Sequence, residues 1–253
     1  MAEPALAIVG AMHQELSALL PLLRQPRSVQ RAGRTFHTGR LHGHRVVLVL
    51  SGIGKVAAAT TATLLIHGFD VKALVFTGVA GGLHPGVNVG DVVVARQLLQ
   101  HDMDASPLFP RFEVPLTGRT HFDADAGLTD ALADAAQRCL ERADALLGAA
   151  TVHAFGLEQT RLHSGLDVSG DRFVSSAAQS AELRACLPDA LAVEMEGAAV
   201  AQVCADFGTP FAVLRCISDR ADDSAHVDFT RFIDAVASTY TALIVNDWLQ
   251  RTA

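Results

Sequence analysis

The chain has 253 residues, of which 50% are hydrophobic and 19% are charged, which predicts a sizeable core and argues against global disorder. The formal net charge of −7 disfavours nucleic acid or an anionic membrane as a partner, because either would require a basic surface. The four cysteines are scattered without CxxC spacing, so neither a zinc site nor a disulfide framework is expected. The sequence starts without the basic segment of a signal peptide, and no apolar stretch reaches the ~18 residues of a membrane span. We therefore expect a soluble cytoplasmic protein.

Apolar runs rich in β-branched residues recur along the chain and predict strands at Leu6–Val9, Val46–Leu50, Ala73–Phe76, Asp91–Ala95, Leu166–Ser169, Leu191–Val193 and Phe211–Ile217. Helices are predicted between these strands. Lys55–His67 is rich in Ala and Thr, and apolar residues recur at helical spacing in Leu128–Ala143, Ala178–Cys186, Gly197–Phe207 and Phe229–Leu249. The strand runs are continuous rather than alternating, which is typical of strands covered on both faces. The sequence therefore predicts an α/β fold: a single domain over residues 1–253, with a mixed, mostly parallel central sheet flanked by helices.

Four glycine-containing turns follow predicted strands: VGAMHQE (9–15), LSGIGKV (50–56), FTGVAGGL (76–83) and VSGDRFV (168–174). Ligands of open α/β sheets bind outside the carboxyl ends of strands, where such turns gather. Any one of them is explained as a tight turn, but four in one chain favour a ligand pocket. None is a standard phosphate cradle, because neither GxGxxG nor GxxxxGK[ST] occurs. Lys55 is accordingly interpreted as a surface residue at the start of a helix.

Four carboxylates follow strands and have simple structural explanations. Glu15 is expected in the first turn of a helix, where it would interact favourably with the helix dipole. Asp219 would cap a following helix. Glu194 and Glu196 lie in the otherwise apolar run AVEMEGAAVAQVC (192–204), where a buried carboxylate without partners is costly. A buried pair with Arg215 would satisfy one of these two glutamates but hardly both.

Eight segments occur in order between residues 10 and 222: GAMHQE, SGIGKVAAA, TGVAGGL, GDVVVA, HDMDAS, SGDRFV, AVEMEGAAVAQVC and RCISDRAD. Together they resemble the 5′-methylthioadenosine/S-adenosylhomocysteine nucleosidases of the purine nucleoside phosphorylase/uridine phosphorylase superfamily. The resemblance covers nearly the whole chain, and VEMEG followed by RCISD is its most specific part. It implies hydrolysis of the N-glycosidic bond between adenine and a 5′-thio-substituted ribose, without a cofactor, in nucleoside catabolism and methionine salvage. The transition state of that reaction resembles a ribosyl oxocarbenium ion.

The resemblance assigns the catalytic steps to the carboxylates. Asp219 matches the acid that protonates the purine, and Ser218 would orient it; a carboxyl in a dry pocket holds its proton closer to neutrality. Glu15 matches the residue that positions and deprotonates the attacking water. Glu196 matches the carboxylate that accepts hydrogen bonds from the ribose hydroxyls, and its charge would favour the cationic sugar. Arg215 would partner the carboxylates and keep Glu196 ionised.

The same resemblance assigns the walls of the pocket. Phe173 would stack on adenine, and the backbone of Val174 would bind the edge of the base. Met195 would pack under the ribose, and Met12 and Ile53 would contact the 5′-substituent. The predicted substrate-binding set also includes Val79, Ala105, Leu108 and Phe229. Position 79 departs from many nucleosidases, in which a serine is common at this turn.

The segment HDMDASPLFPRFEVP (101–115) invites a metal hypothesis, because His101, Asp102 and Asp104 lie close together in sequence. Nothing else at ligand spacing completes such a site, so no metal is expected and these side chains are interpreted as supports for the loop. The resemblance implies a homodimer in which this loop, with Ala105 and Leu108, lies near the active site of the neighbouring subunit.

Three alternatives remain at this stage. A phosphorylase would use phosphate in place of water, but Phe76 and Val79 stand where family phosphorylases carry an arginine and a serine, and Glu15 lies near the anion position. A second alternative is a nucleosidase for another adenosine or inosine derivative, of the futalosine type. The third is a catalytically silent nucleoside-binding module, which the presence of all three carboxylates disfavours.

Overall fold

The computed structural model describes residues 3–223 and 225–252, with the exception of the side chains at 144, 226–228, 234, 235 and 238. The strands are β1 (Ala5–Gly10), β2 (Arg24–Arg31), β3 (Arg34–Leu41), β4 (His44–Leu50), β5 (Val71–Gly82), β6 (Val92–Gln100), β7 (His121–Asp123), β8 (Leu162–Ser169), β9 (Ala190–Glu194) and β10 (Phe211–Asp219). The α-helices are α1 (His13–Leu16), α2 (Lys55–Phe69), α3 (Ala126–Leu140), α4 (Ala143–Leu147), α5 (Ala149–Phe155), α6 (Ala177–Cys186), α7 (Gly197–Phe207), α8 (Ala225–Phe232) and α9 (Ser238–Arg251). Short 3₁₀ segments (Leu20–Leu22, Leu157–Gln159) and a π-helical segment (Ile233–Ala237) complete the described elements.

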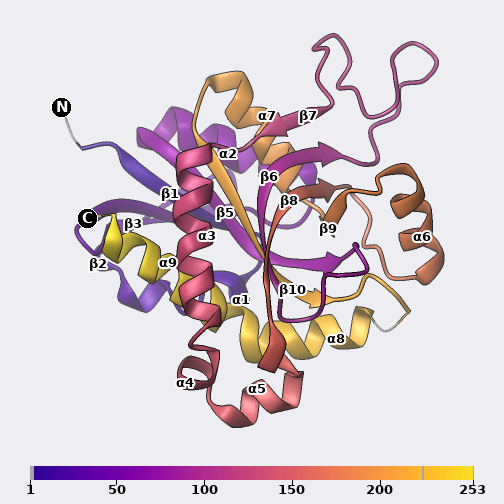
Figure 1. Cartoon of the computed structure of the whole chain (residues 1–253). Coiled ribbons are helices and arrows are strands. Elements are labelled where there is room, and N and C mark those ends of the chain that lie inside the picture. Colours follow the sequence, from indigo (N-terminus) through magenta and orange to yellow (C-terminus); the bar gives the residue numbers. More distant parts are fainter. Residues whose placement is uncertain (1–2, 224, 253) are drawn as a thin grey trace.

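The strands form one mixed sheet in the order β10-β6-β8-β9-β5-β1-β4-β3-β2, with β7 paired to β6 (Figure 1). The long ladders that join β1 to β4 and β5, β5 to β10, and β8 to β6 and β9 are parallel. Strand β10 pairs with both β6 and β5, which closes β5, β9, β8, β6 and β10 into a ring. The predicted α/β fold with a mixed, mostly parallel sheet is confirmed, and the closed ring is a feature that the sequence did not indicate.

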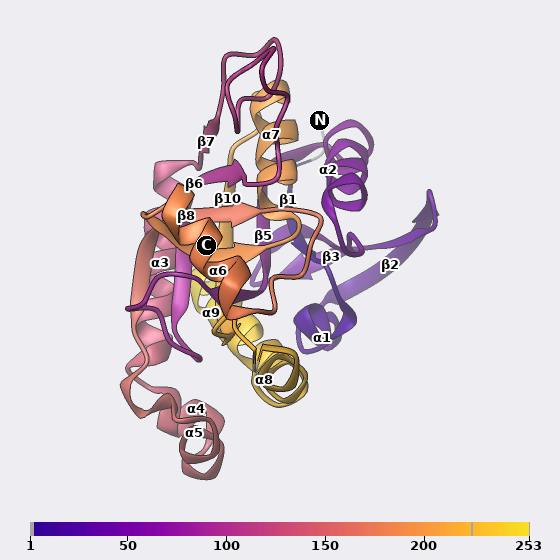
Figure 2. The same cartoon turned by 90° about the vertical axis from the view of Figure 1, so that its right-hand side faces the viewer.

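Alternate residues of the central strands face two hydrophobic cores. In β1, Leu6 and Ile8 belong to the core beneath α3 and α9, whereas Ala7 and Val9 belong to the core beneath α2 and α7. Both sets are buried, which explains why the sequence shows a continuous apolar run in place of an alternating one. In Figure 2, α2 and α7 lie near the top of the view and α3 runs along its left side, with the strands between them.

The hairpin of β2 and β3 was not predicted. All residues of β2 (RQPRSVQR) are exposed, and the strand forms the edge of the sheet. Without a buried face it has no hydrophobic periodicity, so the signal used to predict strands is absent. Arginines, a proline and the register shift between Arg24 and Arg27 are features that keep an edge strand from pairing with other chains.

Among the described helices, none combines the length and the apolar character that crossing a membrane would require.

The register of the sheet brings several strand ends together. Strands β1, β4, β5 and β10 run parallel, so their carboxyl ends lie at the same edge of the sheet. Asp219 at the end of β10 pairs with Gly81, and Gly81 pairs in turn with Val193 of β9. The antiparallel β5–β9 pairing therefore brings Glu194 and the turn that follows it to the edge where β1, β4, β5 and β10 end.

Candidate active site

A cavity of about 440 Å³ opens at this edge. Its lining comes from the carboxyl ends of β5, β9 and β10, from the segments that follow β1, β4, β8 and β9, and from α1 and α8. It includes predicted site residues Met12, Glu15, Ile53, Val79, Phe173, Met195, Glu196, Ser218, Asp219 and Phe229, and also Ala11, Ala80, Gly81, Val193, Glu194 and Thr230, which were not assigned to the pocket from the sequence. Val174 lines a small hollow that shares Phe173, Met195 and Asp219 with the main cavity. The structure thus brings most of the predicted set to one place.

Glu15 is held by backbone donors from two different strand ends. Its Oε2 atom accepts hydrogen bonds from the N–H groups of Ala11 (2.6 Å) and Met12 (2.9 Å), and its Oε1 atom accepts one from Val79 N–H (3.1 Å). The residue is only 2% exposed. Burial raises the pKa of the Glu15 carboxyl above its ordinary value, against the opposite effects of Arg215 and the three backbone donors. A carboxylate held in this way has a fixed position and an increased affinity for a proton.

Gly78 allows Glu15 and Arg215 to approach each other. A Cβ atom at position 78 would overlap Glu15 Oε1 and would lie 2.8 Å from Arg215 Nη1. The backbone of Gly78 pairs with Arg215 across the β5–β10 ladder, so the side-chain space of this glycine is occupied by the two charged groups. Only a residue without a side chain fits between them.

Arg215 is 1% exposed and is surrounded by carboxylates on different elements. Its Nη2 atom donates to Glu194 Oε2, and its Nε atom lies 3.6 Å from Asp167 Oδ2. The guanidinium carbon lies 4.5 Å from the centre of the Phe76 ring, a cation–π contact. Phe76 is therefore beneath the arginine, inside the core, and is not a wall of the cavity.

Glu194 is a structural support for the turn after β9. Besides Arg215, its donors are the hydroxyl of Ser169 and the N–H groups of Glu196 (3.0 Å) and Gly197 (3.0 and 2.8 Å to its two oxygens). Ser169 accepts in turn from Ala198 N–H at 2.7 Å. Glu194 thus fixes the segment that carries Met195 and Glu196 into the cavity, and its carboxylate compensates the first N–H groups of α7.

Glu196 departs from the sequence-based expectation. Its Oε1 atom accepts a hydrogen bond from Gly54 N–H (2.8 Å), whereas the direct contacts of Arg215 are with Glu194 and Asp167. Burial, followed by repulsion from Glu194, raises the pKa of Glu196 to about 8, although Arg215 acts to lower it. Arg215 does partner carboxylates, as expected, but the ones it contacts are Glu194 and Asp167. The expectation that it keeps Glu196 ionised is wrong for the free protein, because the raised pKa of Glu196 favours its protonated form.

Asp219 is 1% exposed, and donors from Ser218 and Ala221 contact its carboxyl. Ser218 Oγ donates to Asp219 Oδ2 at 2.8 Å, and Ala221 N–H donates to Oδ1 at 2.8 Å. A Cβ atom at Gly81 would lie 3.0 Å from Oδ1, so this glycine also leaves room for the carboxyl. The helix that follows begins at Ala225, which leaves Asp219 outside the N-cap position that the simple structural explanation required.

Apolar side chains complete the walls. Phe173 and Phe229 meet edge to face with ring centres 5.8 Å apart, and Phe173 is 41% exposed although it lines the cavity. Ile53 is 58% exposed. Among the described residues that line the cavity, none is arginine or lysine. The lining therefore suits an uncharged, partly aromatic ligand better than phosphate.

No described residue of the 101–115 loop lines the cavity of its own chain. The loop belongs to the segment between β6 and β7, which projects from the body of the molecule in Figures 1 and 2. Neither Ala105 nor Leu108 lines the cavity, and Leu108 is 84% exposed. Asp104 Oδ1 accepts from Ser106 N–H (2.9 Å) within the loop. In the part of the chain that the structure describes, no cluster of His, Cys, Asp and Glu has the geometry of a metal site.

Two residues have roles that the sequence analysis missed. Lys55 begins α2 as predicted, but its side chain is only 16% exposed and forms an ion pair with Asp102 (2.5 Å), so the interpretation as a surface residue is wrong. Asp167, fully buried in β8, was not considered; burial and the nearby Glu194 raise its pKa well above the ordinary value. The signal was present in the sequence as one acidic residue inside the strand run 166–169.

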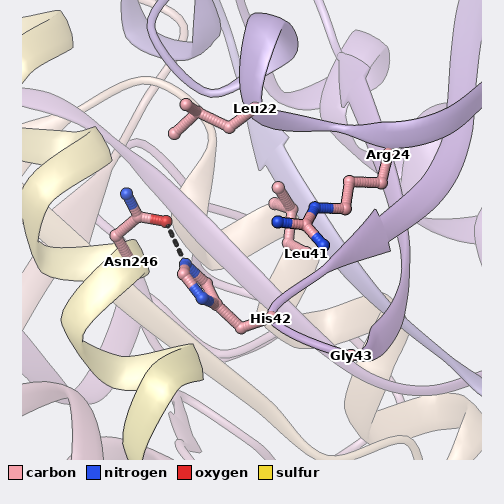
Figure 3. Close-up of a pocket in the computed structure, with 6 residues that line it drawn as sticks. All are labelled: Leu22, Arg24, Leu41, His42, Gly43 and Asn246. Atoms are coloured by element: carbon pink, nitrogen blue, oxygen red, sulfur yellow. Dashed lines mark hydrogen bonds between the residues drawn. The ribbon is translucent and has the colours of Figure 1, made fainter.

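A second cavity, of about 420 Å³, lies between the β3–β4 turn and α9 (Figure 3). Its lining contains Leu22, Arg24, Leu41, His42, Gly43 and Asn246, with one hydrogen bond between His42 Nε2 and Asn246 Oδ1 (2.7 Å). Among these lining residues there is no carboxylate that supplies an acid or a base. The first cavity is therefore the candidate active site.

Residues 5–247 match the sequence model of the phosphorylase superfamily. The chain belongs to this superfamily. Solved nucleosidases of the superfamily have similar structures. A 5′-methylthioadenosine/S-adenosylhomocysteine nucleosidase from Neisseria meningitidis, in complex with methylthio-immucillin-A, is 35% identical, with a TM-score of 0.86 over 98% of this chain and 100% of that chain.

Two further structures agree with this assignment. An S-adenosylhomocysteine nucleosidase from Streptococcus pyogenes is 31% identical, with a TM-score of 0.86 over 100% of this chain and 99% of that chain. A methylthioadenosine/S-adenosylhomocysteine nucleosidase from Colwellia psychrerythraea, in complex with adenine, is 34% identical, with a TM-score of 0.83 over 98% of this chain and 96% of that chain. The resemblance to this nucleosidase family is therefore confirmed over nearly the whole chain.

We predict that Glu196 of the free protein titrates at about 8, far above its ordinary value of 4.5. The folded protein then holds a proton that the unfolded chain has lost, so the free energy of unfolding falls as the pH rises from about 4.5 to about 8. The change E196Q should reduce this slope. Carboxyl ¹³C NMR of glutamate-labelled protein measures the titration directly, with E196Q as the assignment control. A Glu196 resonance that titrates at or below 4.5 would contradict the assignment.

Proposed function

We propose that this protein hydrolyses the N-glycosidic bond of 5′-methylthioadenosine and S-adenosylhomocysteine, releasing adenine and the 5′-thio-substituted ribose. The observation that carries the proposal is the convergence of Glu15, Glu196 and Asp219 on one cavity of about 440 Å³, without a basic residue among its described lining. The similar nucleosidases, solved with adenine or with methylthio-nucleoside analogues, support the same substrate class.

The leaving group requires a proton, which we assign to Asp219. As the bond between C1′ and N9 breaks, its electron pair moves to the purine, and the carboxylic acid of Asp219 transfers its proton to N7, so that adenine leaves as a neutral base. The contacts from Ser218 Oγ and Ala221 N–H fix both oxygens of the carboxyl. A fixed acid delivers its proton without a search for the correct orientation.

The sugar becomes a cation that water attacks, and we assign the activation of that water to Glu15. The carboxylate accepts one proton from the water as the oxygen bonds to C1′. The raised pKa of Glu15 makes it a stronger base than an exposed glutamate. Its backbone contacts with Ala11, Met12 and Val79 hold it at the β1 and β5 ends, so the base does not move during the reaction.

Glu196 would bind the ribose hydroxyls, and its negative charge would stabilise the oxocarbenium ion. In the free site this carboxyl has a pKa of about 8 and is mostly protonated near neutrality. A developing positive charge on the sugar lowers that pKa, so the ionised form of Glu196 is favoured most strongly in the transition state. Met195, fixed by the contacts of Glu194, would pack against the ribose.

The remaining walls fit the two ends of the nucleoside. Phe173 would stack on adenine beside Val174, and Met12 and Ile53 would contact the thioether. A wider hollow of about 800 Å³ adjoins the cavity and shares Ala11 and Ile53 with it. This additional space supports a site that takes the longer homocysteine substituent as well as the methylthio group.

We further propose that the protein acts as a homodimer in the cytoplasm, in nucleoside catabolism and methionine salvage. The 101–115 loop supports the dimer, because Leu108 is 84% exposed, does not line the cavity of its own chain, and belongs to a segment that projects from the body of the molecule (Figure 1). In a dimer, this loop with Ala105 and Leu108 would approach the 5′ end of the neighbouring site.

The reaction is tested by release of the free base from methylthioadenosine, adenosylhomocysteine and a futalosine-type nucleoside, with and without phosphate. We expect release from both thio-nucleosides at a rate that does not depend on phosphate, and a free thioribose as the sugar product. Phosphate-dependent turnover that yields ribose 1-phosphate would identify a phosphorylase instead. Tight nucleoside binding without release of a base at any pH would identify a binding module.

The catalytic assignments are tested by isosteric variants. D219N and E15Q should each lower kcat by about 10²–10⁴ with little change in KM, because each removes a group that transfers a proton in the transition state. E196Q should raise KM and lower kcat together. The control is E158Q, since Glu158 is 51% exposed and pairs with His153 outside the site. A near-normal kcat in D219N would reject the assignment of the acid.

A further inference from the structure

A network of charged and polar groups joins two of the loops that line the cavity to the loop that follows β6. Lys55 is the first residue of α2 and follows the turn with Ile53, Asp102 follows the end of β6, and Asp171 follows the end of β8, two residues before Phe173. We call Lys55, Asp102 and Asp171 the Lys55 network. Its members lie next to the two most exposed walls of the cavity and do not line the cavity themselves.

The contacts of the Lys55 network form a closed triangle. Lys55 Nζ lies 2.5 Å from Asp102 Oδ1, Asp102 Oδ2 accepts from Asp171 N–H (2.9 Å), and Asp171 Oδ1 accepts from Lys55 N–H (2.7 Å). Lys55 Nζ also donates to Gln100 Oε1 (3.1 Å), and Gln100 in turn donates to Gln202 of α7 (2.7 Å). Every edge of the triangle therefore joins two different loops.

The triangle is more than an exposed surface ion pair. The side chains of Lys55 and Asp102 are 16% and 33% exposed, so the pair is partly shielded from solvent. Although burial acts to raise the pKa of Asp102, the hydrogen bonds from Lys55 and Asp171 and the charge of Lys55 hold it below the ordinary value. Asp171 also accepts from the first N–H of the 15-residue helix α2, where a negative charge is favourable.

The network is connected to the proposed chemistry through one residue on each side. The N–H of Gly54, directly before Lys55, donates to Glu196 Oε1 at 2.8 Å. A Cβ atom at Gly54 would lie 3.0 Å from Asp171 Oδ1, so the two loops are in close contact at this point. On the other side, Asp171 lies two residues before Phe173 in the same loop. A shift of the triangle would therefore move two groups together: the N–H of Gly54, which donates to Glu196, and the ring of Phe173, which we expect to stack on adenine.

We infer that Lys55 is a positioning residue for nucleoside binding: with Asp102 and Asp171 it sets the distance between the Phe173 wall and the Ile53–Gly54 wall of the cavity. The inference rests on the proposed function. The contacts that hold Asp219 and Glu15 are made with Ser218, Ala221, Ala11 and Val79, so we expect the acid and the base to keep their positions when the network is broken.

The kinetic test uses K55M and D102N, with K72M as the matched control. Lys72 is an exposed residue at the start of β5, and Lys55 and Lys72 are the two lysines of the sequence. K55M should raise KM for methylthioadenosine about tenfold or more, as expected for a lost charged hydrogen bond, with kcat changed less than about threefold. D102N, which keeps an acceptor for Lys55, should have a smaller effect in the same direction, and K72M none. An unchanged KM in folded K55M would overturn the inference.

A second test needs no variant. Reductive methylation followed by mass spectrometry measures the reactivity of the two lysine amines in the same unmodified protein. We expect Lys55 to react at least about tenfold more slowly than Lys72, because its ammonium is held in an ion pair, and we expect adenine to slow Lys55 further. Burial alone would slow Lys55 without any effect of adenine, so a rate unaffected by saturating adenine would also overturn the inference.

The two tests separate the inference from the proposed function. Absence of adenine release by the wild-type protein contradicts the nucleosidase proposal. Wild-type turnover with an unchanged KM in K55M contradicts the positioning role alone. The labelling experiment and adenine binding by calorimetry require no turnover, so they test the Lys55 network in either case, and they remain applicable if K55M does not fold.

Discussion

The guanidinium of Arg215 is the charge on which the arrangement of this site depends. It is 1% exposed and lies over the ring of Phe76. It donates a hydrogen bond to Glu194 and also lies close to the carboxyl groups of Asp167 and Glu15. Taking a charge out of water is costly, and removing one partner of a buried pair typically costs about 3–5 kcal/mol. Arg215 stabilises the carboxylates of β8, β9 and α1 together, and this brings the ends of these elements close enough to share one cavity.

The number of acids around Arg215 exceeds what one positive charge can compensate. Glu194 accepts the direct hydrogen bond from Arg215 and four further donor contacts. The other three acids are less well compensated, and burial raises the pKa values of Glu15, Asp167 and Glu196. For a nucleosidase this excess is useful. A water-activating base benefits from a raised pKa, and a carboxylate whose ionised form is favoured by a sugar cation binds the transition state better than the ground state.

Much of the fold was predictable because the central strands are buried on both faces and therefore appear as apolar runs. The exposed hairpin of β2 and β3 lacks that signal, and the pairing of β10 with both β5 and β6 depends on register, which no local pattern specifies. The site residues were assigned through the family resemblance that the motifs after the strands carry, and the structure brings Glu15, Glu196 and Asp219 to one cavity. The sequence did not indicate which carboxylate takes the N–H groups of Arg215, or that Lys55 turns inward, because both depend on distances between loops that are remote in the chain.

The most direct test of this account is the turnover of G78A. The Cβ atom of alanine would overlap Glu15 Oε1 and lie 2.8 Å from Arg215 Nη1, so the water-activating carboxylate must move while Asp219 and Glu196 keep their own contacts. We predict that folded G78A loses at least about 100-fold in kcat for methylthioadenosine, as expected when a catalytic group is displaced by about 1 Å. G127A, in the first turn of α3, where a Cβ makes an ordinary contact of 3.4 Å, should keep the wild-type rate. Wild-type turnover by G78A would contradict the central claim that Glu15 and Arg215 must meet in the space left by this glycine.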